Sequence, residues 1–114
     1  MVFVTAAKFD NLREIAGTSI NSSYQLVGTI FIVNPRIIAF HNSTDVDLYV
    51  STDGINNKLR MASNSFKIHD VQANKSDSGD NLIPKAIGIW VKETSEGTPT
   101  EGDFWVEAIY SDNA

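Results

Sequence analysis

Four stretches of this chain alternate apolar and polar residues one by one, and this pattern limits the fold more than any other feature. The alternation runs over residues 46–51, 65–71, 87–92 and 104–110. Successive side chains of a β-strand point to opposite faces of a sheet, so a period of two predicts half-buried strands. Residues that favour turns, such as asparagine, aspartate and glycine, separate these stretches.

Three further segments predict strands. Residues 24–33 are too rich in β-branched and aromatic residues for a surface helix, and Asn34-Pro35 ends the run. Residues 36–41 are apolar at both alternating sets of positions, as in a central strand, and residues 59–61 predict a short strand. About seven or eight short strands with regular turns predict an all-β fold. We expect a single-domain antiparallel β-sandwich, jelly-roll-like, or a small barrel.

The N-terminal region follows a different pattern. The length of 114 residues fits one domain over residues 1–114. Within it we expect residues 1–22 to form an N-terminal arm, in which Asn11–Glu14 resembles a capping box and Gly17 suits the end of a one-turn helix. The apolar residues Val2, Phe3 and Val4 are candidates for an arm donated to a neighbouring molecule.

The charge and cysteine content exclude several classes of function. The formal net charge is −5, with fourteen acidic against nine basic residues, whereas nucleic-acid binding depends on lysines and arginines that neutralise phosphates. No cysteine is present, which removes disulfides, zinc–thiolate sites and thiol catalysis. No apolar run approaches the ~20 residues of a membrane span, and no secretory leader opens the chain. We therefore expect a cytosolic product without nucleic-acid or membrane partners.

Few residues suggest catalysis or metal binding. His41 and His69 are the only groups whose ordinary pKa lies near neutrality, and the chain has no recognisable hydrolase, metalloprotease or phosphate-loop motif. Asp45, Asp47 and Asp53 could suit calcium, but the spacing does not fit an EF-hand loop. We expect no enzymatic activity, no cofactor and no metal, and we keep an imidazole-based enzyme as a third hypothesis.

The aromatic residues at strand positions indicate a candidate interaction surface. If the last two strong strands pair as a hairpin, their alternation puts Trp90 and Trp105 together on the face opposite to the core. Tyr49 also occupies a non-core position in its own strand. Such a face could anchor a protein interface or a sugar ring, or it could be a second inner face covered by another segment.

The order of segments from about Leu12 onward resembles a widespread family of small all-β proteins encoded by tailed bacteriophages. The most specific match is the run from Asn42 to Gly54 (Asn-Ser-Thr-Asp-Val-Asp-Leu-Tyr-Val-Ser-Thr-Asp-Gly). The other matching segments are Leu12–Ala16, Ser23–Gly28, Asn34–Ile38, Ala62–Phe66, Asp70–Lys75 and Phe104–Tyr110. The chain departs from the resemblance at Leu82-Ile-Pro-Lys-Ala86, where Leu-Pro-x-Gly is expected.

The resemblance implies a virion structural protein without catalytic activity. It implies a place at the head, the head–tail junction or a fibre attachment, with assembly in the host bacterial cytoplasm. The expected partners are capsid, portal or tail proteins and other copies of the chain in a symmetric homo-oligomer. The alternative hypothesis is a carbohydrate-binding module built on a β-sandwich.

Overall fold

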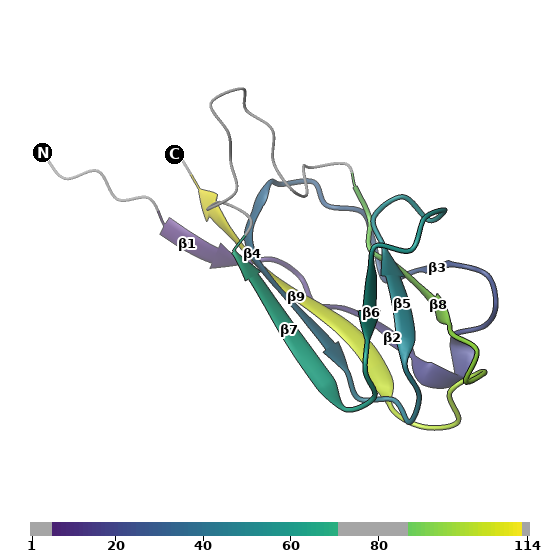
Figure 1. Cartoon of the computed structure of the whole chain (residues 1–114). Coiled ribbons are helices and arrows are strands. Elements are labelled where there is room, and N and C mark those ends of the chain that lie inside the picture. Colours follow the sequence, from purple (N-terminus) through teal and green to yellow (C-terminus); the bar gives the residue numbers. More distant parts are fainter. Residues whose placement is uncertain (1–5, 71–86, 113–114) are drawn as a thin grey trace, which may run out of the picture.

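The computed structural model describes residues 6–70 and 87–112, which form two antiparallel sheets packed face to face (Figure 1). The predicted all-β sandwich is therefore confirmed. The elements are β1 (Ala6–Phe9), β2 (Arg13–Ala16), the 3-10 helix η1 (Gly17–Ser19), β3 (Gln25–Leu26), β4 (Pro35–Asn42), β5 (Leu48–Ser51), β6 (Leu59–Met61), β7 (Ser65–Asp70), β8 (Trp90–Glu93) and β9 (Asp103–Asp112).

The long strand β9 organises the larger sheet. This five-stranded sheet has the order β1-β9-β4-β7, and β2 pairs with another part of β9. The four-stranded sheet has the order β3-β8-β5-β6. The chain therefore passes repeatedly from one sheet to the other. Figure 1 shows two of these connections, from β4 to β5 and from β6 to β7.

The core lies between the two sheets and uses the alternating apolar positions that the sequence predicted. The fully buried side chains come from both sheets and from the loops beside them, and each contributes about 1.5–3 kcal/mol relative to exposure. They include Ile20, Val27, Phe31, Ile38, Phe40, Leu48, Val50, Met61, Ile89, Val91, Phe104 and Val106.

The predicted hairpin between the last two strong strands is wrong. Strand β8 pairs with β3 and β5, whereas β9 pairs with β1, β2 and β4. Residues 94–102 therefore connect the two sheets instead of closing a hairpin. Because Val91 and Phe104 are both buried in the common core, Trp90 and Trp105 point to opposite outer faces of the sandwich.

The predicted strand over residues 24–33 is shorter than expected. Only Gln25–Leu26 is paired as β3, and Gly28 then adopts a left-handed backbone with φ +67°. The buried Arg13 guanidinium accounts for this departure, because it donates to the carbonyl oxygens of Thr29 (Nε–O 2.7 Å) and Ile30 (Nη2–O 3.2 Å). These carbonyl groups are satisfied by Arg13 instead of by a neighbouring strand.

The predicted arm over residues 1–22 is corrected for residues 6–20. Arg13–Ala16 is strand β2, not a helical turn, and it pairs with β9. Arg13 and Ile20 are buried, so this segment belongs to the sandwich. Val2, Phe3 and Val4 lie outside the described residues, as does Leu82–Ala86, where the chain departs from the phage-family pattern.

Candidate functional site

The outer face of the five-stranded sheet carries a row of aromatic side chains across three strands. His41 on β4 is directly opposite Phe66 on β7 and Trp105 on β9. Directly opposed residues of antiparallel strands share a face of the sheet. Because Phe40 and Val106 of these strands point into the core, the row of three rings points outward.

The three rings stack on one another. The centroids of His41 and Trp105 are 4.8 Å apart with an interplanar angle of 8°, and those of His41 and Phe66 are 5.8 Å apart with an angle of 21°. Trp105 Nε1 donates to Glu107 Oε1 at 3.1 Å, and the same oxygen lies 3.7 Å from His41 Nε2. The imidazole is thus held between two rings and beside a carboxylate.

Aliphatic and aromatic side chains extend this row along the sheet. Ile68 is opposite Ala39, and Ile37 is opposite Ile109, which is in turn opposite Phe9. Phe9 is 81% exposed, and Phe66 and Ile68 are each 63% exposed. The solvent face of an antiparallel sheet is usually polar, so this arrangement is unusual. We call these residues the apolar face: Phe9, Ile37, Ala39, His41, Phe66, Ile68, Trp105 and Ile109.

The outer face of the four-stranded sheet is different in character. Tyr49 is there, as predicted, opposite Lys92 on β8 and Arg60 on β6. Lys92 Nζ lies 4.8 Å from the ring centroid of Tyr24 and 5.9 Å from that of Tyr49, and the Arg60 guanidinium lies 5.8 Å from the Tyr49 centroid. The tyrosine rings therefore already have cationic partners within the chain.

Trp90 lies on this second face and packs against the turn after β5. A Cβ atom added at Gly54 would lie 3.1 Å from Trp90 Cδ2, so the indole closely contacts the glycine backbone. Gly54 has φ +73°, which any other residue would adopt at a cost. Trp90 therefore has a packing role in the four-stranded sheet, and it does not join Trp105 in one surface.

The three aspartates considered for calcium belong to separate hydrogen-bond groups. Asp45 accepts from the backbone and hydroxyl of Thr100. Asp53 accepts from Ser51 Oγ at 2.7 Å and from the backbone of Asn56 at 2.9 Å. Hydrogen bonds of this kind stabilise the charged carboxylate and hold the pKa of both groups below the usual range.

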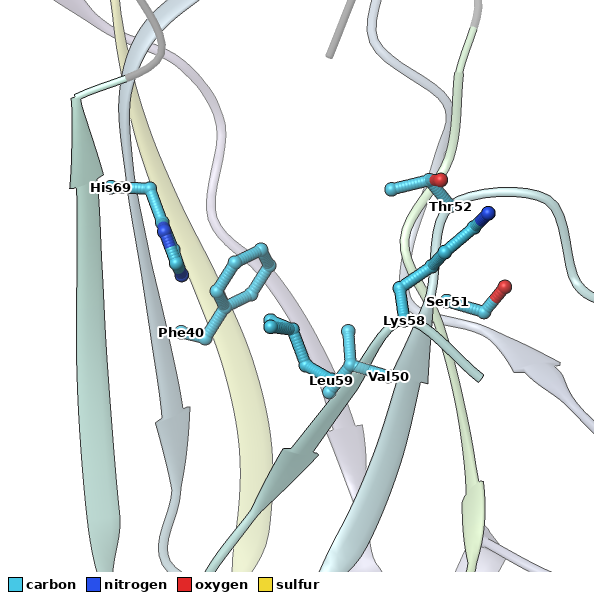
Figure 2. Close-up of a pocket in the computed structure, with 7 residues that line it drawn as sticks. All are labelled: Phe40, Val50, Ser51, Thr52, Lys58, Leu59 and His69. Atoms are coloured by element: carbon cyan, nitrogen blue, oxygen red, sulfur yellow. The ribbon is translucent and has the colours of Figure 1, made fainter. Parts of the chain in front are cut away.

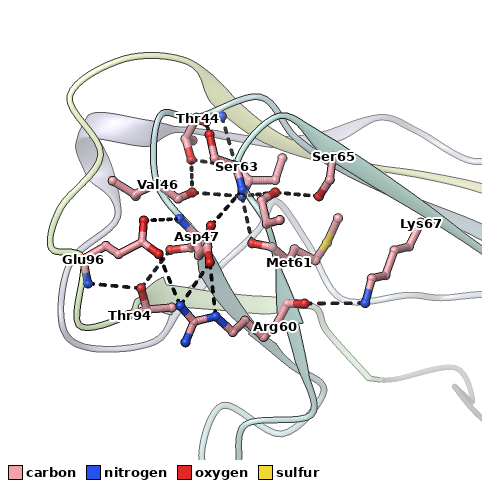
Figure 3. Close-up of polar contacts among 12 residues, drawn as sticks. Thr44, Val46, Asp47, Arg60, Met61, Ser63, Ser65, Lys67, Thr94 and Glu96 are labelled. Atoms are coloured by element: carbon pink, nitrogen blue, oxygen red, sulfur yellow. Dashed lines mark hydrogen bonds and ion pairs between the residues drawn. The ribbon is translucent and has the colours of Figure 1, made fainter.

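Asp47 belongs to a polar network that ties the strand ends together (Figure 3). Its carboxylate accepts from the backbone of Ser63 at 3.0 Å and from Arg60 Nη2 at 3.0 Å, and Arg60 also donates to Glu96. The Ser63 and Arg60 hydrogen bonds lower the pKa of Asp47. In the part of the chain that the structure describes, no group of three or more histidine, cysteine or acidic side chains could hold a metal ion.

His69 lies on the opposite side of its sheet from His41. It lines a cavity of about 370 Å³ between the two sheets, together with Phe40, Val50, Leu59 and Lys58 (Figure 2). Its ring is edge-on to Phe40, with centroids 5.5 Å apart, and its buried Nε2 has no hydrogen-bond partner. The two imidazoles therefore do not form a common site.

Sequence reasoning placed Trp105 and Tyr49 on outer faces but missed the residues that make the apolar face. The alternation at residues 65–71 put Phe66 and Ile68 on one side of a strand and Lys67 and His69 on the other, without saying which side is inside. The structure puts Lys67 and His69 on the core side of β7, opposite Phe40 and Ile38, although Lys67 stays exposed to solvent. The signal that could have identified the face was His41, an imidazole at the non-core position of an apolar strand.

Comparisons of the chain with protein-family models, curated proteins and solved structures find no match. Within residues 6–70 and 87–112, no helix has the length and apolar character needed to cross a membrane.

Proposed function

We propose that this chain is a non-enzymatic structural protein of a bacteriophage virion that binds its neighbours through the apolar face. It decorates the head or joins parts at the head–tail or fibre junction. Its partners are capsid, portal or tail proteins, and several copies act together in a symmetric assembly. Assembly takes place in the cytoplasm of the host bacterium.

The observation that carries this proposal is the exposure of large apolar side chains beside a fixed aromatic stack. Contiguous apolar surface of this kind marks interaction sites in soluble proteins, and aromatic anchors dominate the binding energy of protein interfaces. Completing the burial of Phe9, Phe66 and Ile68 contributes roughly 3–6 kcal/mol before the cost of association. That gain is modest for one contact, but repeated copies on a particle add such contacts through avidity.

The carbohydrate-binding alternative has less support. A sugar-stacking platform needs accessible ring faces. Lys92 lies over the rings of Tyr24 and Tyr49, and Trp90 packs against Gly54. The aromatic residues of the four-stranded sheet are therefore engaged within the chain.

Quantitative mass spectrometry of purified particles tests the proposal. The phage that encodes this chain is grown with the wild-type chain or with the double variant Phe66→Ser/Ile68→Ser, and copies per particle are counted. We expect the wild-type chain at a fixed copy number and the double variant reduced roughly tenfold or more, since about 1.4 kcal/mol corresponds to a factor of ten.

The matched control is Ile55→Ser, because Ile55 is 77% exposed but lies outside the apolar face. It is expected to be incorporated normally. Particles that lack the wild-type chain would overturn the virion role, and normal incorporation of the double variant would overturn the role of the apolar face.

A further inference from the structure

At the outward-pointing strand positions of the apolar face and beside it, the charged side chains are all acidic. On β9, Asp103 and Glu107 share the outward side with Trp105, and on β2 Glu14 is directly opposite Trp105. On β7, Asp70 is opposite the outward residue Ile37. The face therefore carries acidic side chains and no outward lysine or arginine at its regularly paired positions, with Glu107 among the apolar residues and Glu14, Asp70 and Asp103 beside them.

Lys8, Lys67 and Arg13 of the same described strands occupy positions opposite residues of the other side, Tyr110, Phe40 and Val106. Lys67 is opposite the buried Phe40 and reaches towards the carbonyl oxygen of Arg60, at 3.5 Å. Arg13 is buried, and Arg36 lies at the bulge between Pro35 and Ile37. Among the regularly paired residues of this sheet, none of those that point outward is a lysine or an arginine.

We propose that the partner of the apolar face is a different protein that presents an apolar strip flanked by lysine or arginine side chains. This inference rests on the proposed function and names the chemistry of its partner. Opposite charges across an interface speed association and select the partner, whereas facing like charges are costly. A second copy of this chain would bring Glu14 and Glu107 against acidic groups of the same kind, and each copy carries a net charge of −5.

The shape of the site also indicates a macromolecular partner that covers the face. Small-molecule sites are concave, whereas this face is the outer surface of a sheet. Strand β7 pairs with β4 on one side within the described residues, but it carries the charged Lys67 on its core side. An inward-pointing charge on an edge strand discourages the addition of another strand. The partner therefore rests on the face instead of extending the sheet at β7.

Nuclear magnetic resonance titration with three synthetic peptides tests the inference. The peptides have equal length and alternate leucine with lysine, leucine with glutamate, or serine with lysine. We expect only the leucine–lysine peptide to shift the indole N–H signal of Trp105, while the signal of Trp90 stays fixed as an internal control. The shift should weaken as salt is raised from about 0.05 M to 0.5 M, because salt screens exposed charges.

A charge reversal separates a local effect from the overall charge. Glu14→Lys should weaken binding of the leucine–lysine peptide roughly three- to tenfold. Glu101→Lys changes the net charge equally but lies in the turn before β9, and it should leave binding close to that of the wild-type chain. Equal binding of the leucine–glutamate peptide, or equal effects of the two reversals, would overturn the inference.

Two further outcomes distinguish this inference from the proposed function. If Glu14→Lys is incorporated into particles normally while Phe66→Ser/Ile68→Ser is not, the charged partner is wrong and the apolar face still binds. If sedimentation shows a dimer that Phe66→Ser/Ile68→Ser dissociates, the occupant is a second copy and the inference is overturned. A monomer in solution and reduced incorporation of both variants support it.

Discussion

The imidazole of His41 lies almost parallel to the indole of Trp105 on the next strand, with ring centroids 4.8 Å apart. Trp90, the second tryptophan, lies on the other sheet and contacts Gly54. The two tryptophans therefore have separate roles, one in an exposed face and one in packing.

Serine substitutions should separate these roles. Trp105→Ser loses a stacking partner, which costs about 0.5–1.5 kcal/mol, and should reduce incorporation into particles. Trp90→Ser removes the ring that covers the Gly54 turn, and it should destabilise the fold more while leaving incorporation of the folded chain unchanged. Urea unfolding and particle mass spectrometry measure the two effects. If both variants lost stability and incorporation to the same extent, these separate roles of the two tryptophans would be contradicted.

Replacement of Arg13 should destabilise the whole sandwich. Its guanidinium donates to Asp10 at 2.9 Å and to the carbonyl groups of Thr29 and Ile30, and it lies 4.1 Å from the Phe31 ring centroid. Arg13→Met leaves these partly buried acceptors without their donor, so we expect a loss of about 2–4 kcal/mol in the free energy of unfolding. Chemical denaturation measures it, and a loss below about 1 kcal/mol would show that Arg13 is dispensable.

Two glycines with left-handed backbones should respond differently to alanine. Gly102 has φ +81°, and a Cβ there would lie 2.1 Å from the carbonyl oxygen of Ser43. Gly97 has φ +93°, with no heavy atom within 4 Å of such a Cβ. Gly97→Ala should cost about 1–2 kcal/mol from backbone strain alone, whereas Gly102→Ala should cost clearly more. Thermal melts of both variants check this, and equal losses would contradict it.

Acid should destabilise the fold through the aspartates at its turns. The pKa of Asp53 is lowered by hydrogen bonds from Ser51, Asn56 and Ile55, while an unfolded aspartate titrates at about 3.9. A carboxyl group whose pKa is lower in the folded than in the unfolded state stabilises the fold above about pH 4. This stabilisation is lost as the pH falls towards the pKa of the folded state. Urea midpoints from pH 6 to pH 2 should therefore fall steeply for the wild-type chain and less steeply for Asp53→Asn. If the urea midpoints of the wild-type chain and of Asp53→Asn fell equally with pH, this role of Asp53 would be contradicted.

The sequence predicted the sandwich because its side-chain alternation reports directly on burial. Ile89 and Val91, like Phe104 and Val106, are buried as their positions predicted. Alternation does not report which strand pairs with which, since both arrangements of the last two strands bury the same residues. Pairing depends on how residues 94–102 cross between the sheets.

Hydropathy alone did not reveal the apolar face, because it indicates the wrong direction for the side chains of β7. Phe66 and Ile68 would ordinarily point to a core, but they point to solvent, and His69 packs edge-on against Phe40 instead. The buried Arg13 similarly ended the expected strand at residues 24–33 by binding backbone groups far along the chain. Both arrangements depend on contacts between distant segments, which local patterns do not contain.

Hydroxyl-radical footprinting of the chain, free and within purified particles, measures whether the apolar face is covered in the assembly. We predict that oxidation of Phe66 and Trp105 falls several-fold in particles, while that of Ile55, exposed in the turn after β5, changes little. Equal oxidation of Phe66 and Trp105 in the free and assembled states would show that the apolar face stays uncovered, and would contradict the account.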